Sequence, residues 1–140
     1  MKTSTLTFQN FVVSHFHYET LKENISENKF TLRPRALLSR KEEKINIHID
    51  LTLKDIDNMF FIKLSATGLF DFDFQDETYL NSFISINGPA IIFPYIRSFI
   101  SSFTALSGLD TVTLPTLNLS GYKQDILDNM IDLDREEEEE

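Results

Sequence analysis

Cysteine and tryptophan are absent from the 140 residues, and glycine, proline and methionine occur only four, four and three times. Without cysteine the chain forms no disulfide framework, no thiolate metal site and no cysteine nucleophile. The absence of disulfides fits a reducing compartment, so we expect a cytoplasmic protein. Long apolar runs are lacking too. The start, MKTSTLTFQN, has no apolar segment of a secretory leader, and no run approaches the ~20 residues of a membrane span, so we expect no direct membrane insertion.

Positively charged residues are in the minority. The chain has 13 Lys and Arg and 22 Asp and Glu, which gives a formal net charge of −9. No basic face is evident, which argues against nucleic acid as a partner. Residues 136–140 are all glutamate, and we expect 135–140 to be a disordered acidic tail. The apolar content of 41% is sufficient for one folded domain, which we place at residues 1–134.

Four segments alternate between apolar and polar residues, which predicts four strands at 6–21, 30–39, 44–54 and 59–74. The short turns between the later segments require antiparallel pairing. Phe11 and Val13 break the alternation of the first strand and give its middle two apolar faces, which indicates a contact with another subunit. Pro34 predicts an edge strand, and Gly68 predicts a bulge or a close approach of another element.

After the strands the period changes to that of helices. Residues 76–86 predict a short helix, and 87–106 predict the main helix, with Asn87 as its cap, Pro89 in its first turn, Pro94 inside it and Gly108 just past its end. Arg97 is the only charge of that helix. A helix with so little charge is covered on several sides, either by a partner subunit or by a monomeric core. Residues 109–119 predict an extended apolar arm, and 121–133 a short amphipathic helix.

No catalytic motif is present, and we expect neither an enzyme nor a cofactor. His15 and His17 have the i, i+2 spacing of metal ligands on a strand, but solvated residues on a polar face explain them better. Asp71 and Asp73 could form an acid pair, yet they also simply keep the outer face of an aromatic strand in water. The H-E-x-x-H, P-loop, G-x-G-x-x-G and G-x-S-x-G patterns do not occur.

Phe93-Pro94-Tyr95 within the helix, Gly108, Leu114-Pro115 and Leu117-Asn118-Leu119 together resemble the SecB family of bacterial export chaperones and their SecB-like relatives. The resemblance extends more weakly from about Phe8 to Leu133. It implies an α+β fold: a four-stranded antiparallel sheet followed by a long helix, an extended arm and a short C-terminal helix. It also implies a homotetramer, built as a dimer of dimers. We expect the subunit contacts to include Phe11, Val13, Tyr95, Phe99 and Ser102.

The same resemblance implies an ATP-independent holdase that binds unfolded preproteins in an apolar groove. The residues carried over to that groove are Phe30, Leu32, Phe60, Leu114, Leu117, Leu119, Ile126 and Met130. An ordinary core role for each of these residues remains an alternative.

In the family the outer sheet face docks the export motor SecA, which makes SecA a candidate partner. Glu19 and Phe61 match that docking site, whereas His15 and Lys63 stand where the family has acidic residues. A lysine in place of a carboxylate reverses the attraction to a basic docking segment. Two other hypotheses stay open: a SecB-like chaperone dedicated to the antitoxin of a toxin–antitoxin module, and an assembly protein whose apolar surfaces only form the oligomer.

Overall fold

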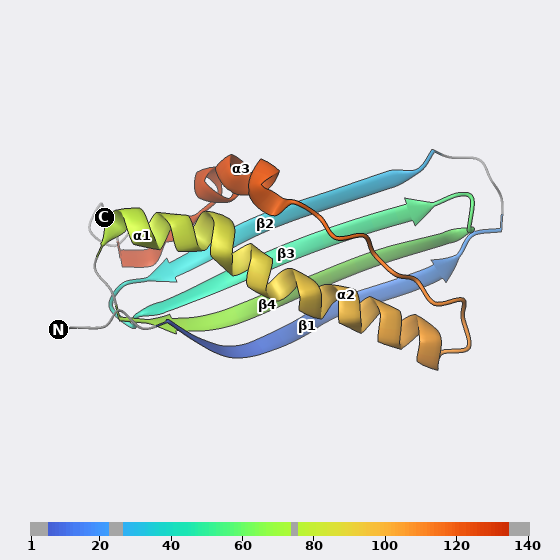
Figure 1. Ribbon diagram of the computed structural model, residues 1–140, viewed down its shortest axis with the longest axis horizontal. Helices are drawn as coiled ribbons and strands as arrows, with labels where there is room; N and C mark the ends of the chain where they lie inside the picture. The colour runs from blue at the N-terminus through green and yellow to red at the C-terminus, as the bar shows by residue number, and fades with distance from the viewer. Residues whose placement is uncertain (1–5, 23–26, 74–75, 135–140) are drawn as a thin grey trace.

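Four long strands form one antiparallel sheet in the computed structural model, which describes residues 6–22, 27–73 and 76–134 (Figure 1). They are β1 (Leu6–Thr20), β2 (Lys29–Ser39), β3 (Lys44–Asp55) and β4 (Phe60–Phe72). The strand order is β1-β4-β3-β2-β5, in which the two-residue β5 (Ile131–Asp132) runs parallel to β2. The four predicted strands and the α+β class are therefore confirmed, and β5 is an addition that the sequence did not predict.

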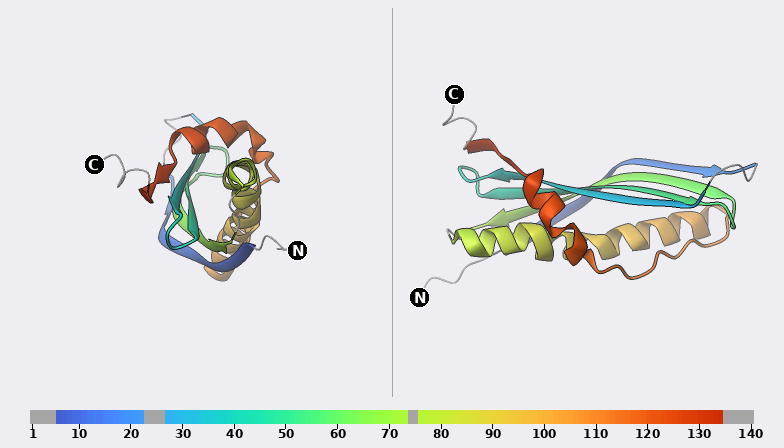
Figure 2. Two further views of the ribbon diagram at one scale, coloured as in Figure 1. Left: turned by 90° about the vertical axis from the view of Figure 1, so that its left-hand side faces the viewer. Right: turned by 90° about the horizontal axis from the view of Figure 1, so that it is seen from above.

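Strict alternation in β3 sets the two faces of the sheet. Ile45, Ile47, Ile49 and Leu51 are fully buried, while the residues between them stay accessible. Successive strand residues point to opposite faces, so one face of the sheet is almost entirely apolar. We call this face, which the helices cover, the inner face, and the opposite one the outer face; Figure 2 shows the long helix and the arm on one side of the sheet.

Two register shifts interrupt β1, between Phe8 and Asn10 and between Val13 and His15. Each shift inserts an extra residue and so resets the face to which the following side chains point. Phe11 and Val13 consequently pack against the core together with Phe8 and Phe16. Phe11 and Val13 therefore do not form a second apolar face, and of the residues in the middle of β1 it is Val12, 39% exposed, that points outward.

One unbroken helix crosses the inner face. It consists of α1 (Glu77–Ser82), the π-helical turn η1 (Phe83–Asn87) and α2 (Gly88–Leu106). The predicted helix start at Asn87 is wrong, since Asn87 makes no side-chain cap, and the N-cap is Asp76, whose carboxylate accepts hydrogen bonds from the backbone N–H groups of Thr78 and Tyr79. Pro94 lies inside α2 as predicted, and Gly108 has the left-handed φ of 77° that favours glycine after a helix.

This continuous helix, Glu77–Leu106, is long and apolar enough to cross a membrane by length and composition. The sequence argument considered only uninterrupted apolar runs, whereas this helix meets the criterion by its length and mean hydropathy. Half of the apolar window is buried against the rest of the molecule, however, which is typical of the core helix of a globular domain. Its apolar character is accounted for in part by Ile92, Phe93, Ile96 and Ile100, which face the sheet.

Gly68 of β4 allows the helix to approach the sheet. A Cβ atom at this position would lie 2.3 Å from Cγ2 of the buried Ile92. The expectation of a close approach at Gly68 is thus confirmed, and the register shifts that resemble bulges lie in β1 instead.

Replacing Gly68 by alanine is expected to lower the free energy of unfolding by about 1–3 kcal/mol, because the methyl group displaces Ile92 in a close-packed core. Thermal unfolding followed by circular dichroism at fixed protein concentration measures the loss as a drop of several degrees in Tm. Gly121→Ala is the matched control, since a Cβ there meets nothing within 4 Å. Equal Tm values for the two variants would contradict this account of Gly68.

Beyond α2 the chain doubles back as the arm, residues 107–118, which has no regular secondary structure. It leads into the 3-10 turn η2 (Leu119–Tyr122) and the short helix α3 (Lys123–Asp128). The extended arm is confirmed. The predicted helix at 121–133 is too long, because Ile131 and Asp132 form β5 beside Leu37 and Leu38.

Hydrogen bonds and ion pairs of carboxylates connect the end of the described chain to the β2–β3 turn. Asp134 accepts hydrogen bonds from the backbone N–H groups of Arg40 and Lys41, the latter at 2.9 Å. The Arg40 guanidinium also bonds Asp132 at 3.1 Å and Glu77 of α1. One arginine thus joins β5 to the start of the long helix. The predicted acidic tail at 135–140 lies outside the described residues.

Candidate functional site

A groove of about 870 Å³ opens between the arm and one end of the sheet. We call it the arm groove. Residues 108–115 and Leu117 form one wall. The other wall comes from the ends of all four long strands and the β3–β4 turn, through Tyr18, Thr20, Phe30, Leu53, Asp55, Asn58, Met59 and Phe60. The arm and the end of the sheet, which are far apart in the sequence, therefore enclose one space over the inner face.

The arm groove is mainly apolar and partly open. Phe30 is 40% exposed, and the rings of Tyr18 and Phe60 stack with centroids 6.1 Å apart. Asp55 adds one carboxylate, which accepts hydrogen bonds from the side chain and backbone of Asn58 at 2.9 and 3.0 Å. These bonds lower the pKa of Asp55, so it stays ionised at neutral pH. The groove offers aromatic and aliphatic surface with two carboxylates, Asp55 and Asp110 of the arm.

Hydrogen bonds from side chains of α2, rather than from a neighbouring strand, hold the backbone of the arm in position. Val112 donates its N–H to the Thr104 hydroxyl at 3.0 Å, and its carbonyl accepts from the Ser101 hydroxyl at 2.9 Å. Arg97, the single charge of the main helix, donates Nε to the Leu114 carbonyl at 3.0 Å. The side of α2 that bears Arg97, Ser101 and Thr104 is therefore the surface that carries the arm.

Four of the eight groove residues expected from the sequence line the arm groove together: Phe30, Phe60, Leu114 and Leu117. Leu114 is only 2% exposed and contributes mostly to the core. Sequence reasoning missed Tyr18, Leu53, Met59 and Val112. Their signal was weak, because each ends an apolar pattern at a strand terminus or in an irregular segment, where periodicity cannot assign a face.

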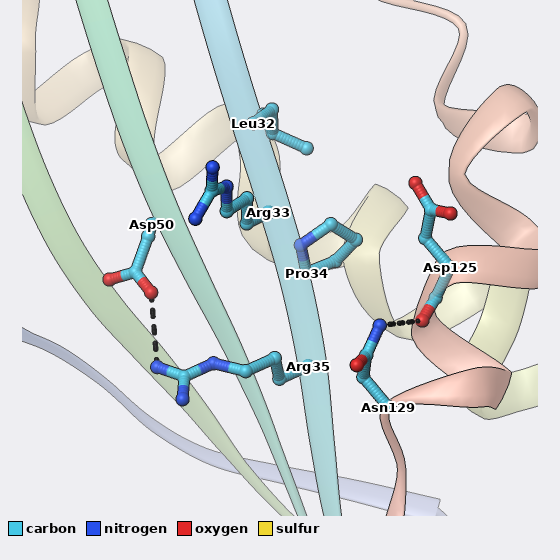
Figure 3. A pocket seen from close by; sticks show the side chains of 7 residues that line it. All are labelled: Leu32, Arg33, Pro34, Arg35, Asp50, Asp125 and Asn129. Carbon is cyan, nitrogen blue, oxygen red and sulfur yellow. Dashed lines mark hydrogen bonds and ion pairs between the residues drawn. The ribbon is translucent and has the colours of Figure 1, made fainter.

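The other four expected residues lie elsewhere. Leu32 lines a separate pocket of about 490 Å³ between β2 and α3, which Arg33, Arg35, Asp50, Asp125 and Asn129 make polar (Figure 3). Leu119 borders a hollow of about 270 Å³ beside Phe93 and Pro94. Ile126 is fully buried in the core, and Met130 packs against that core. The structure therefore does not bring all eight into one surface.

The expected subunit-contact residues gather along β1 and the adjacent side of α2. Tyr95 is 47% exposed and its ring contacts Phe8 and Phe11. Phe99 packs on Phe16, with ring centroids 5.0 Å apart. Val13 is half-buried towards the helix, whereas Ser102 is exposed. Leu106 continues this side of the helix and is 87% exposed, so an apolar strip of the long helix has no cover within the described chain.

The outer face carries a polar network at its centre. Asp50 accepts hydrogen bonds from Ser65 at 2.6 Å and from His48 at 3.0 Å, and it pairs with Arg35 at 3.0 Å. Burial by itself would raise the pKa of Asp50, but these hydrogen bonds and charges outweigh it and hold that pKa below its usual value. His48 in turn bonds the Thr67 hydroxyl at 2.8 Å. Asp50 is thus an ionised, fully partnered structural group.

The two docking residues expected from the sequence are neighbours on this face. Glu19 and Phe61 are direct partners in the β1–β4 register. His17 bonds Glu19 at 3.2 Å and places its ring 6.2 Å from Phe61. Lys63 lies opposite His17, and His15 opposite Ser65. In residues 6–22, 27–73 and 76–134, no group of three or more His, Cys, Asp or Glu side chains is placed to hold a metal ion.

Comparison with known proteins gives consistent matches. The sequence model of the SecB family, described as preprotein translocase subunit SecB, matches residues 19–127. An uncharacterized protein of Methanocaldococcus jannaschii, MJ0357, is 30% identical, in an alignment covering 86% of this chain and 84% of that protein. The protein-export protein SecB of Roseobacter denitrificans is 27% identical over 67% of this chain, which spans 58% of that relative's length.

Solved structures share the fold. The SecB-like chaperone Rv1957 of Mycobacterium tuberculosis, in complex with a ChAD peptide from the HigA1 antitoxin, superposes with a TM-score of 0.62 at 16% identity, covering 80% of this chain and 87% of that one. A protein of unknown function from Streptococcus agalactiae superposes with a TM-score of 0.53 at 11% identity, covering 82% and 100% of the two chains. Since the family model covers most of the sequence and the structure has the matching α+β architecture, the chain belongs to the SecB family.

Proposed function

We propose that this protein is an ATP-independent holdase that binds unfolded or non-native polypeptides in the arm groove. Family membership supports a chaperone role. The observation that carries the finer proposal is the groove itself, about 870 Å³ of mostly apolar space with Phe30 40% exposed. Folded proteins hide their long apolar segments, so such a groove selects chains that have not yet folded. The proposal includes no enzymatic step and no cofactor.

The physical basis of binding is burial of apolar side chains. Each Leu or Phe of a client that is fully buried in the groove contributes about 1.5–3 kcal/mol, without a need for a particular side-chain order. The arm lacks regular hydrogen bonding, which suits a wall that must fit varied clients. Release then follows when the client folds or passes to another binder, and nucleotide hydrolysis is not required.

Assembly into a homotetramer in the cytoplasm is part of the proposal. The exposed strip formed by Tyr95, Ser102 and Leu106 supports it, since an apolar surface of this kind usually marks an interface. Several grooves on one oligomer would contact one long client at several points, and multivalency then raises the overall affinity above that of a single groove.

Export is the first candidate role, and service to an antitoxin is the second. The match to a SecB-like chaperone that binds an antitoxin peptide favours the second. On the outer face, Lys63 lies close to Glu19 and Phe61 and reduces the negative charge available to a basic docking segment. Affinity purification from the native host separates the roles: recovery of SecA supports export, and recovery of a small DNA-binding antitoxin supports the dedicated role.

Light scattering tests the holdase activity directly. A chemically denatured client diluted into buffer without ATP is expected to aggregate less as the concentration of this protein rises, with saturation at a fixed ratio of oligomer to client. Unchanged scattering at every ratio and with several clients would refute the holdase and would favour an assembly protein whose apolar surfaces serve the oligomer alone.

A further inference from the structure

Four basic side chains gather on the outer face at the end of the sheet that also carries the arm groove. They are Lys29, Arg33, Lys54 and Lys63, which we call the basic patch. Strand alternation fixes their direction: Leu32, Leu51 and Ile62 are buried on the inner face, and each basic residue lies one or three positions from one of them on the same strand, so it points outward. Lys29, Arg33 and Lys63 are exposed and Lys54 is half-buried.

The register brings these charges together. Lys29 lies directly opposite Lys54 in the β2–β3 pairing, and Lys54 lies opposite Phe61 in the β3–β4 pairing. Lys63 is two residues from Phe61 on the same face of β4. Like charges directly opposite each other on a sheet destabilise it. The Lys29–Lys54 pair therefore lowers the stability of the sheet, so stability does not explain why both residues are lysine.

In the part of the chain that the structure describes, none of the four basic side chains forms an ion pair. Arg33 lies opposite Asp50 in the β2–β3 register, but Asp50 forms its ion pair with Arg35, and Glu19 bonds His17. A locally positive surface thus stands on a protein whose formal net charge is −9.

We infer that the basic patch binds an acidic, extended segment of a partner protein, with an apolar side chain of that segment packed on Phe61. Charge complementarity favours a partner of this kind, since carboxylates would relieve the repulsion between Lys29 and Lys54. Phe61 is half-buried and sits among the cations, which supplies an apolar anchor beside the charged contacts.

The overall charge decides against larger polyanions. Nucleic acid or an anionic bilayer extends far beyond the patch and meets the acidic remainder of the protein, whereas a short peptide segment covers the patch alone. The patch points to the outer face by strand alternation, whereas the arm groove lies on the inner face, the side on which Figure 2 shows the arm. An acidic partner can therefore bind while the groove holds a client.

Fluorescence anisotropy of labelled peptides with the full-length protein tests the inference. A peptide rich in Glu with a central Leu is expected to bind, and the same peptide with Lys in place of Glu is expected not to. Binding should weaken strongly between about 0.05 M and 0.5 M salt, because exposed charges are screened over a shorter distance. Absence of binding by the acidic peptide at low salt would overturn the inference.

Charge-reversal variants locate the site. Lys54→Glu with Lys63→Glu is expected to weaken binding of the acidic peptide by about tenfold or more. The neutral pair Lys54→Gln with Lys63→Gln should show a smaller loss and guards against a folding defect. Lys123→Glu is the matched control on α3, an exposed lysine that is not one of the four patch residues, and should leave binding unchanged. An equal loss in the control would overturn the assignment.

Two further outcomes identify a different occupant. A change in sedimentation mass on Lys54→Glu with Lys63→Glu, without peptide binding in the parent, would make the patch a contact between copies of this chain. Peptide binding that emerges only after Glu136–Glu140 are all changed to Gln would make the chain's own end the occupant. Either result overturns the inference while leaving the holdase proposal, which is read by light scattering, unaffected.

Discussion

Replacing Phe30 and Leu117 by glutamate is expected to weaken suppression of client aggregation by at least about tenfold. Both side chains line the arm groove, and neither is fully buried, so the charges enter the groove without opening the core. Two apolar contacts are lost, each worth up to about 1.5–3 kcal/mol in a fully buried client. Light scattering measures the effect as the protein concentration needed for half-maximal suppression.

Leu114 is the wrong position for this test, although the sequence suggested it. It is 2% exposed, so a charge there would enter the core and destabilise the chain. Val12→Glu is the matched control for Phe30→Glu, because Val12 is 39% exposed, like Phe30 at 40%, but lies on the outer face. Full suppression by the Phe30 and Leu117 variant, with an unchanged sedimentation mass, would remove the arm groove as the client site.

Introducing aspartate at Ser102 and Leu106 is expected to dissociate the oligomer. Both positions are exposed, one turn apart on α2, and Leu106 at 87% exposure has little contact with its own chain. The substitutions should therefore leave the fold of one subunit intact. An apolar residue at the centre of an interface contributes about 2 kcal/mol or more, so two buried charges per subunit raise the dissociation constant at least about 100-fold.

Analytical ultracentrifugation at micromolar concentration checks this, with circular dichroism to verify the fold. Aspartate at Thr113 and Thr116 of the arm adds the same charge at two exposed positions away from the strip, and the mass of that control should equal that of the parent. If Ser102→Asp with Leu106→Asp keeps the parent's mass, this strip is not the subunit contact.

Much of the sheet was predictable because its signal is local. The alternation in 44–54 assigns β3 and its buried face correctly, since isoleucine or leucine occupies every second position there. In β1 the same rule fails, because two register shifts restore the inward direction of Phe11 and Val13 after the period has slipped. A broken alternation is compatible with a bulge or with two apolar faces, and only the paired strand distinguishes them.

The helix shows a different failure. Asn87 and Pro89 are strong start signals, yet the chain is helical on both sides of them. A π-helical turn at Phe83–Asn87 shifts the hydrogen bonding, so that Gly88 donates to the Phe83 carbonyl five residues earlier. Such a turn lets a proline without an N–H enter an existing helix, and burial of Phe83 and Ile84 stabilises it. This depends on tertiary packing, which local signals do not contain.

The groove was only half predictable for a similar reason. Family resemblance placed Phe30, Phe60 and Leu117 together, because they sit on elements whose positions are general to the fold. Whether Ile126 reaches the groove or the core depends on where the short helix α3 comes to lie, and in this chain it is fully buried. Exposure, rather than identity, separates a binding residue from a core residue, and exposure is a property of the assembled structure.

The outward edge of β2 has a consequence for the behaviour of the protein in a concentrated solution. Among the described residues, Leu37 and Leu38 of β2 pair with β5, and the earlier residues of this strand have no strand neighbour on that side. Pro34 has no N–H to offer there, and Arg33 and Arg35 flank it with charge. These residues disfavour edge-to-edge strand pairing between copies of the protein in fibrils. If the protein holds unfolded chains as proposed, an edge of this kind disfavours cross-β growth of its own copies on those chains.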